Sequence, residues 1–441
     1  MRNNTLLILA ALLLAGGAAR AQEGPWSLKD CIRHALDHNL TVQQSALTVE
    51  QREVELSTAQ ARRLPGVSAS ASENLSFGRG LTEDNTYSNA NTTSTSFSLS
   101  GNVPVFQGFD ITNGIKLSKL NLAAATSDLE KARDDIRVSV AQAYVQILYN
   151  QELLRVAREQ TAHDADLLEQ IRERLNAGKV SAAEVSAQQA TLAQSRQSEI
   201  QAEGNLRMSL LDLSQLLELS SPEGFSIVTP EVDDPSRVLL MRPESIYEEA
   251  VAVKPAVEAA RLNVDYAGLA ITRAKGAYLP TISLSGGLGT NYYTNSKYLS
   301  PTFGEQLKNN FSQYVGVSMN IPIFQRLSVR NSVRNAELNL RGQQIQLESV
   351  KKALYKEIQQ AYYNAVTAQA RYAGSRESAA SARQHYELTE EKYKVGKAGV
   401  AEYNDARNSW LRAESEHIQA RYQCLYQTKL LDFYRGKELE F

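Results

Sequence analysis

The chain has 441 residues, a formal net charge of −2 and an ordinary globular mixture of hydrophobic (43%) and charged (22%) residues. Its length allows two or three domains of ordinary size. Because the near-neutral charge gives no basic footprint, we expect no nucleic-acid partner.

The first predicted element is a targeting segment. Arg2 precedes an apolar run at 6–15, and Ala19-Arg20-Ala21 fits the small-x-small cleavage pattern, which predicts a signal peptide over residues 1–21. The apolar run is short for a membrane-spanning helix, and no later stretch approaches ~18 consecutive apolar residues. An exported chain without such a helix is either soluble or a β-barrel.

The mature chain contains an internal two-fold repeat. The heptapeptide VPVFQGF, which includes Pro104, returns as IPIFQRL with Pro322 218 positions later (322 − 104 = 218). The same interval separates Tyr144 from Tyr362 and Gly178 from Gly396. The repeat period is far longer than that of solenoid repeats, so each unit is half a protein. The predicted domains are a first repeat over 22–219, a Pro-containing linker over 220–242 and a second repeat over 243–441.

Each repeat has the same predicted order of elements: a helix ended by Leu-Pro, two alternating strands joined by a polar loop, a very long helix, a Gly-containing turn and a final helix. The long helices have about 65 residues, or roughly 95 Å at about 1.5 Å per residue. Their apolar and small residues recur at spacings of three and four, which suits coiled-coil packing. The expected helices are 28–63, 113–177 and 181–219 in the first repeat, and 243–277 and 331–394 in the second.

The strands alternate between an apolar and a polar face. Residues 67–71 read VSASA and residues 96–100 read SFSLS, and the second repeat continues the alternation as far as Ile321 and Ile323. A soluble sheet with one wet face gives the same pattern. The strands are close to the ~9–11 residues of a tilted membrane strand, and the loops at 78–95 and 291–310 are long and polar, which favours an outer-membrane barrel.

Four strands from one chain cannot close a membrane barrel, because open edges leave backbone groups unsatisfied in lipid. Three chains would supply twelve strands, an even number in the known range. The predicted fold class is therefore an α+β membrane protein: a trimeric 12-stranded outer-membrane β-barrel, with four strands per chain, continued by a long α-helical coiled-coil periplasmic tunnel.

The doubled half, the two strand-end heptapeptides, the Leu-Pro strand entries and the Gly-containing helix turns together resemble the TolC-like outer membrane efflux proteins. The resemblance covers about residues 26–434. It implies a homotrimer in outer-membrane lipid that docks to a periplasmic adaptor protein and an energised inner-membrane transporter. The chain would then be a passive exit duct of a tripartite efflux or type I secretion system, without enzymatic activity or a cofactor.

The resemblance also implies a periplasmic gate at the helix turns. Tyr393 occupies the position of the family's gate tyrosine, Glu402 and Asp405 fall where the family has paired acidic residues, and Glu184 matches an acidic gate position in the first repeat. Lys397 is adjacent to the place where the family has arginine and this chain has an alanine. The alternative is that the three acidic residues only interact favourably with the helix dipole. Three-fold symmetry would turn each carboxylate into a ring that favours cations.

Two further sets of residues have expected roles. Pro104, Gly108 and Pro322 are expected to end the strands and turn the chain from sheet to helix. In the second repeat Arg326 stands in place of the glycine, so the two transitions need not share one backbone conformation. The exposed helix tips are the expected docking surface for the adaptor, at Gly178, Lys179, Gly396 and Lys397.

A catalytic or metal site is not expected. His34 and His38 have the i, i+4 spacing of a two-ligand site, but no third ligand accompanies them in the sequence. Cys31 and Cys424 are expected to be semi-buried thiols in preference to a bridged pair. The alternative function is a soluble periplasmic coiled-coil scaffold or adaptor, with the strands forming a small soluble domain.

Overall fold

A computed structural model describes residues 24–81, 85–230, 238–296 and 299–440. The predicted signal peptide, residues 1–21, lies outside the described residues. The chain folds as two compact units. The hairpin unit comprises the described parts of residues 1–45, 129–255 and 351–441, and the sheet unit comprises those of 46–128 and 256–350.

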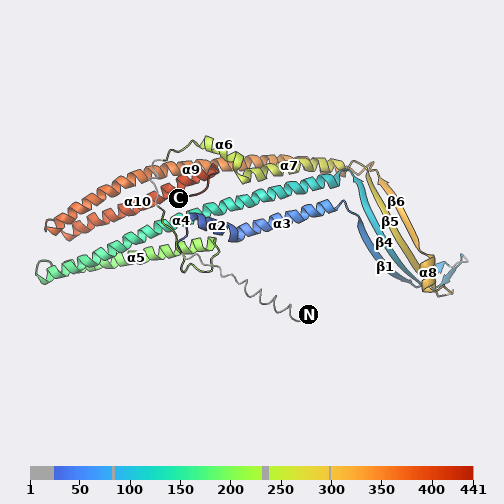
Figure 1. The fold of residues 1–441 in the computed structure, drawn as a ribbon, viewed down its shortest axis with the longest axis horizontal. Coiled ribbons are helices and arrows are strands. Elements are labelled where there is room, and N and C mark those ends of the chain that lie inside the picture. Colours follow the sequence, from blue (N-terminus) through green and yellow to red (C-terminus); the bar gives the residue numbers. More distant parts are fainter. Residues whose placement is uncertain (1–23, 82–84, 231–237, 297–298, 441) are drawn as a thin grey trace, which may run out of the picture. The chain divides into compact units, whose positions relative to one another are not determined.

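The sheet unit contains a four-stranded antiparallel sheet in the order β1-β4-β5-β6 (Figure 1). Its strands are β1 (Gly66–Ser76), β4 (Thr92–Gln107), β5 (Thr281–Asn295) and β6 (Ser312–Asn320). β1 and β4 come from the predicted first repeat, and β5 and β6 come from the predicted second repeat. The two loops are more ordered than expected: one contains the short hairpin of β2 (Arg79–Leu81) and β3 (Tyr87–Asn89), and the other contains α8 (Phe303–Asn309).

The predicted alternation places serine hydroxyls opposite one another on one face of the sheet. The Oγ atoms of Ser70 and Ser98 are 2.7 Å apart, as are those of Ser72 and Ser96. Large apolar side chains such as Val317 are exposed on the strands. Within one chain, the sheet therefore presents one hydroxyl face and one apolar face.

The two strand-end heptapeptides do not have the same secondary structure. In β4, the strand continues through Pro104 to Gln107, with a register shift between Pro104 and Phe106. β6 ends at Asn320, so the prediction that Ile321 and Ile323 continue the strand is wrong for the single chain. The reason is pairing: β5 begins at Thr281, opposite Asn320, so no residue of β5 lies opposite Ile321.

The helix predicted at the start of each repeat is in fact two helices. In the first repeat these are α2 (Leu28–His38) and α3 (Leu40–Ala61), and in the second α6 (Pro243–Val253) and α7 (Pro255–Gly276). Asn39 makes the first break, because its Oδ1 accepts a hydrogen bond from the Thr41 amide (2.9 Å) and so caps the next helix. Pro255 makes the second, because a proline disfavours helical backbone at the residue before it.

The long helices are α4 (Asp110–Asn176) and α9 (Ser328–Lys394), of 67 residues each, and both contribute residues to the two units. In the hairpin unit, α5 (Ala182–Leu216) turns back along α4, and α10 (Val400–Tyr434) turns back along α9 (Figure 1). Among the described residues, no helix combines the length and the hydrophobicity needed to cross a membrane.

The predicted linker contacts the rest of the hairpin unit through the backbone of Ile227 and Val228. Trp26 forms a parallel bridge with Ile227, and the Tyr144 hydroxyl donates to the carbonyl oxygen of Val228 (2.5 Å). Tyr144 is almost fully buried. Residues 231–237 of the predicted linker lie outside the described residues.

Candidate functional site

Both helical hairpins end in the same type of turn. Gly178 and Gly396 have positive φ angles of 70° and 75°, the left-handed conformation that favours glycine after a helix. In each turn the next amide bonds back to the helix, from Lys179 to the Arg174 carbonyl (2.9 Å) and from Lys397 to the Lys392 carbonyl (2.8 Å). All four predicted docking residues are exposed.

A cluster of aromatic side chains lies just inside the turn of α9 and α10. Tyr393 is buried and stacks on Tyr403, with ring centroids 4.9 Å apart. Tyr386 stacks on Trp410 at 5.0 Å. Leu167 and Ile171 of α4 belong to the same core, so the cluster joins the two hairpins. We call Tyr386, Tyr393, Tyr403 and Trp410 the aromatic cluster.

Sequence reasoning identified Tyr393 and missed the other three members of the aromatic cluster. The signal for them was present: Tyr386 and Tyr393 are seven residues apart on α9, and Tyr403 and Trp410 are seven residues apart on α10. A heptad interval places both members of each pair on one helix face. The two pairs flank the Gly396 turn, which brings these faces together.

A buried ion pair lies beside the aromatic cluster. The guanidinium of Arg407 (α10) donates to the carboxylate of Asp164 (α4), and their side chains are 3% and 0% exposed. Ser195 Oγ also donates to this carboxylate, and Gln188 Nε2 donates to it at 3.1 Å. Burial alone would raise the pKa of Asp164, but the bonds from Arg407 and Ser195 outweigh burial and hold it below its ordinary value. The pair is therefore ionised at neutral pH.

Hydrogen bonds also connect the residue next to Asp164 with the aromatic cluster. His163, the residue before Asp164, has its Nε2 atom 2.5 Å from the Tyr403 hydroxyl, which in turn is 3.2 Å from the Tyr386 hydroxyl. Burial lowers the pKa of His163, and the nearby positive charge of Arg407 lowers it further. Burial also raises the pKa of Tyr403. Both groups are thus neutral at neutral pH.

The predicted acidic gate residues lie outside this buried group. Glu402 and Asp405 are exposed on α10, on either side of the buried Tyr403, and Lys397 is exposed in the turn. Glu184 is half-buried in the first turn of α5, where it forms a capping box with Ser181. The structure therefore brings Tyr393 into the buried group and leaves the predicted charges at its surface.

The strand-to-helix transitions of the sheet unit share one backbone conformation. Gly108 and Phe109 have φ angles of 58° and 65°, and Arg326 and Leu327 have φ angles of 51° and 62°. Gly108 has a further constraint, because a Cβ atom there would lie 2.2 Å from the Gly276 carbonyl oxygen. Arginine replaces glycine in the second repeat without changing the left-handed turn.

His34 and His38 interact with each other and with their own helix. Their rings stack with centroids 4.0 Å apart, and His38 Nδ1 lies 3.0 Å from the His34 carbonyl oxygen. Over the part of the chain that the structure describes, no group of three or more His, Cys, Asp or Glu side chains is arranged to hold a metal ion. Cys31 and Cys424 are both buried, and they do not form a disulfide bond with each other.

Comparison with known proteins gives consistent matches along most of the chain. The sequence profile of the Outer membrane efflux protein family matches residues 31–218 and 246–436. Outer membrane protein TolC of Escherichia coli (strain K12) is 26% identical over 362 residues, which is 78% of this chain and 71% of that protein. Proteases secretion protein PrtF of Dickeya chrysanthemi is 22% identical over 443 residues, covering 96% and 90%.

A solved structure shares the fold. The outer membrane protein VceC of Vibrio cholerae superposes with a TM-score of 0.75 at 17% identity, over 94% of this chain and 97% of that one.

Proposed function

This chain belongs to the outer membrane efflux protein family, and we propose that it works as a homotrimer whose three sheets close one barrel in the outer membrane. The chain is an outer-membrane exit duct for efflux or secretion, which extends into the periplasm. This family is one of transport ducts and not of enzymes. The alternative of a soluble periplasmic scaffold is set aside, because the family match covers both repeats.

We infer the trimer from the four-stranded sheet, which has two edges within one chain. β1 and β6 are the outer strands of the sheet, and each has one side without a strand partner among the residues of the chain that the structure describes. In lipid, such edges leave backbone N–H and C=O groups unsatisfied at a cost of several kcal/mol each, so a membrane sheet must close on itself. Three copies give twelve strands, and the long helices then form the wall of a periplasmic tunnel.

We assign the ends of the helical hairpins to the gate and to docking. In a trimer, the exposed carboxylates of Glu402 and Asp405 and the half-buried carboxylate of Glu184 would form rings of three. Tyr393 and the apolar side chains around it hold the two hairpins together, and the buried ion pair fixes which positions meet. The exposed turns at Gly178, Lys179, Gly396 and Lys397 are the surface for a periplasmic adaptor, which links the duct to an inner-membrane transporter. Lys397 is also near enough in sequence to the acidic residues to contribute to the gate.

Pro104, Gly108 and Pro322 mark the transition from barrel to tunnel in this proposal. The paired left-handed residues that follow each strand turn the chain into α4 or α9, which begin at Asp110 and Ser328. Outer-membrane lipid would then surround the sheet, and the helices would lie in the periplasm.

The test is cell fractionation followed by a mass measurement. The protein is expected in the outer-membrane fraction, to need detergent for extraction, and to give the mass of three chains by light scattering after correction for detergent. Recovery from the soluble periplasm, or a monomer under mild detergent conditions, would contradict the proposal.

A further inference from the structure

We propose that β6 pairs with β1 of a second copy of this chain in one defined register, and that residues 321–325 join the strand when they pair. The proposal rests on the trimer proposed above and adds the residue-by-residue contact between its copies. The pairings inside the chain, together with the sequence repeat, determine that register.

The first step is the offset between equivalent strands. Gly66 of β1 lies opposite Asn102 of β4, and Thr281 of β5 lies opposite Asn320 of β6. If these pairs are equivalent, the first strands of the repeats are 215 positions apart (281 − 66 = 215) and the second strands 218 (320 − 102 = 218). The second offset is the one that separates Pro104 from Pro322 in the sequence. The sheet and the heptapeptides thus support the same alignment of the repeats.

The second step uses the contact between the repeats as a template. Within the chain, β4 of the first repeat pairs with β5 of the second, and Ser100 lies opposite Gly287. The β6 equivalent of Ser100 is Ser318 (100 + 218 = 318), and the β1 equivalent of Gly287 is Ser72 (287 − 215 = 72). The template therefore places Ser318 opposite Ser72 of a second copy. The same operation gives Met319 opposite Ala71, Val315 opposite Leu75, and Ile321 opposite Ala69.

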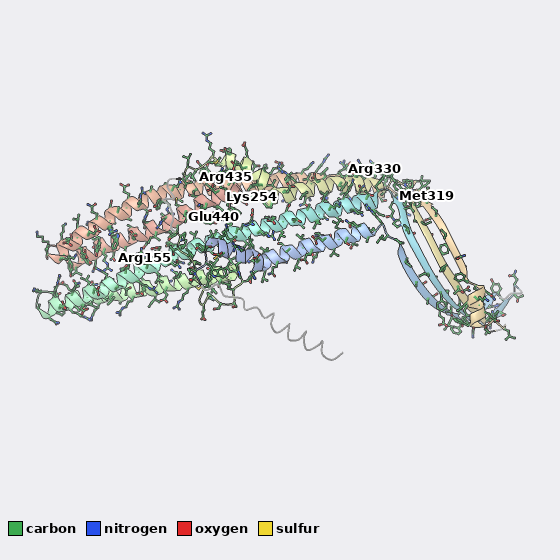
Figure 2. The ribbon with its side chains drawn as sticks, in the orientation of Figure 1. Arg155, Lys254, Met319, Arg330, Arg435 and Glu440 are labelled. Atoms are coloured by element: carbon green, nitrogen blue, oxygen red, sulfur yellow. The ribbon has the colours of Figure 1, made fainter. Side chains whose placement is uncertain are left out.

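Side-chain chemistry supports the matching of the two faces in this register independently of the repeat. Ser318 already contacts Ser283 on its own sheet (Oγ–Oγ 2.7 Å), and Ser72 contacts Ser96 at the same distance, so the pairing extends one hydroxyl face. On the other face, Met319 is 59% exposed in the single chain and would meet Ala71. Figure 2 shows Met319 near the helix-proximal end of β6. A slip of one residue would place hydroxyls opposite apolar side chains, which the two-residue period of strands disfavours.

The pairing also explains why β6 is shorter than β4. β1 begins at Gly66, opposite Asn102, and so does not reach residues 103–107. These residues are strand because β5 pairs with them. Their equivalents, residues 321–325, would find a partner only in residues 66–69 of a second copy. Ile323 and Phe324 are 95% and 76% exposed in the single chain, which is unusual for large apolar side chains next to a strand. The matching left-handed turns at Gly108 and Arg326 let the backbone leave both strands in the same way.

Disulfide trapping between serine-to-cysteine variants tests the register. Ser318→Cys combined with Ser72→Cys places two thiols directly opposite one another, within the range of a disulfide. Ser318→Cys combined with Ser70→Cys is the matched control, because Ser70 is on the same face two residues away, where the diagonal separation of about 7–8 Å is too long. Ser70→Cys with Ser98→Cys, a pair inside one chain, is the positive control for oxidation.

After oxidation in outer membranes, the Ser318/Ser72 pair should give covalent dimers and trimers on a non-reducing gel, and the Ser318/Ser70 pair at least tenfold less. Cross-linking of both pairs equally, of the control pair only, or of neither in a preparation that stays trimeric would overturn the register and leave the trimer standing. A monomeric protein would overturn the proposed function as well.

Hydrogen exchange provides a second measurement on the unmodified chain. Amides within residues 321–325 should be protected in the intact trimer, to the level of residues 103–107, and should exchange rapidly in dissociated monomers. Equal exchange in both states would contradict the extension of the strand.

Discussion

Asp164 and Arg407 illustrate how one residue pair can specify a contact without adding much stability. Both side chains are buried, so desolvation opposes the attraction between their charges. Replacing a buried pair by apolar residues of similar volume is often neutral or stabilising, whereas removing one partner leaves a buried charge uncompensated. The pair therefore fixes which positions of α4 and α10 meet, while the surrounding apolar side chains hold the hairpins together.

The first prediction compares the removal of Arg407 alone with the removal of both members of the ion pair. Arg407→Met alone should destabilise the hairpin ends by about 3–5 kcal/mol, and the double variant with Asp164→Leu should recover most of that loss. Denaturant unfolding would be followed by the fluorescence of Trp410, which belongs to the aromatic cluster, in a Trp26→Phe background, since the chain has two tryptophans. If the double variant is as unstable as the single one, the pair contributes net stability and the account of specificity is wrong.

The second prediction concerns pH and His163. Folding lowers the pKa of His163 below its ordinary value of 6.5, mainly through burial and then through Arg407, while Asp164, Asp166 and Glu390 act in the opposite direction. The folded state therefore binds fewer protons than the unfolded state as the pH falls below 6.5. The stabilisation is complete above that value and is lost as the pH falls through the folded pKa.

The denaturant concentration at the midpoint of unfolding, followed by Trp410 fluorescence, should therefore decrease as the pH is lowered from about 7.5 to about 5. This decrease should be smaller in His163→Asn. His385→Asn is the control, because His385 is exposed on α9 and lies outside the buried group. An unchanged pH dependence in His163→Asn would show that another group is responsible.

At the scale of the element, the strand-to-helix turn at Gly108 leaves no room for a side chain. Gly108→Ala must place a Cβ atom 2.2 Å from the Gly276 carbonyl oxygen and keep a positive φ angle. We expect a loss of well over 1–2 kcal/mol, the approximate cost of the left-handed conformation alone. Gly342→Ala, in the exposed interior of α9 with open space around it, should instead gain up to about 1 kcal/mol. Thermal melting of both variants measures the difference, and equal effects would contradict the close contact.

The strands give a prediction that separates the two faces of the sheet. Val317→Arg places a charge on the apolar face near the middle of β6 and should cost about 2–4 kcal/mol if that part of the face meets the middle of the bilayer. Ser318→Arg, one residue later on the hydroxyl face, should be tolerated. The yield of trimer in the outer membrane reports the difference. Equal yields, or a greater loss for Ser318→Arg, would contradict the assignment of the faces.

For the whole molecule, the spacing of apolar residues along the sequence predicted most of the helices and strands. Alternation predicted the four strands, and the three-to-four spacing predicted α4 and α9 to within a few residues. The break at Asn39 was missed because it depends partly on a partner far away in the chain: Asn39 Nδ2 donates to the Leu216 carbonyl oxygen (3.1 Å). The shortness of β6 was missed because strand length depends on the neighbouring strand as well as on the sequence of the strand itself.

The candidate site was predicted in part. The turns, Tyr393 and the exposed acidic positions follow from local patterns and the family resemblance. Asp164 and Arg407 are 243 positions apart, and neither stands out from the many charged residues of the long helices. Only the packing of two hairpins shows that this aspartate and this arginine are buried, so no local pattern could have identified them.

In the proposed duct, three copies bring the carboxylates of Glu402 and Asp405 together at the periplasmic end. The most direct measurement is the reversal potential of the purified protein in a planar lipid bilayer under a salt gradient. We expect stepwise conductance with cation preference, and a clear loss of that preference when Glu402→Ala and Asp405→Ala are combined. Absence of stepwise conductance, or the same reversal potential in the double variant, would contradict the proposed duct.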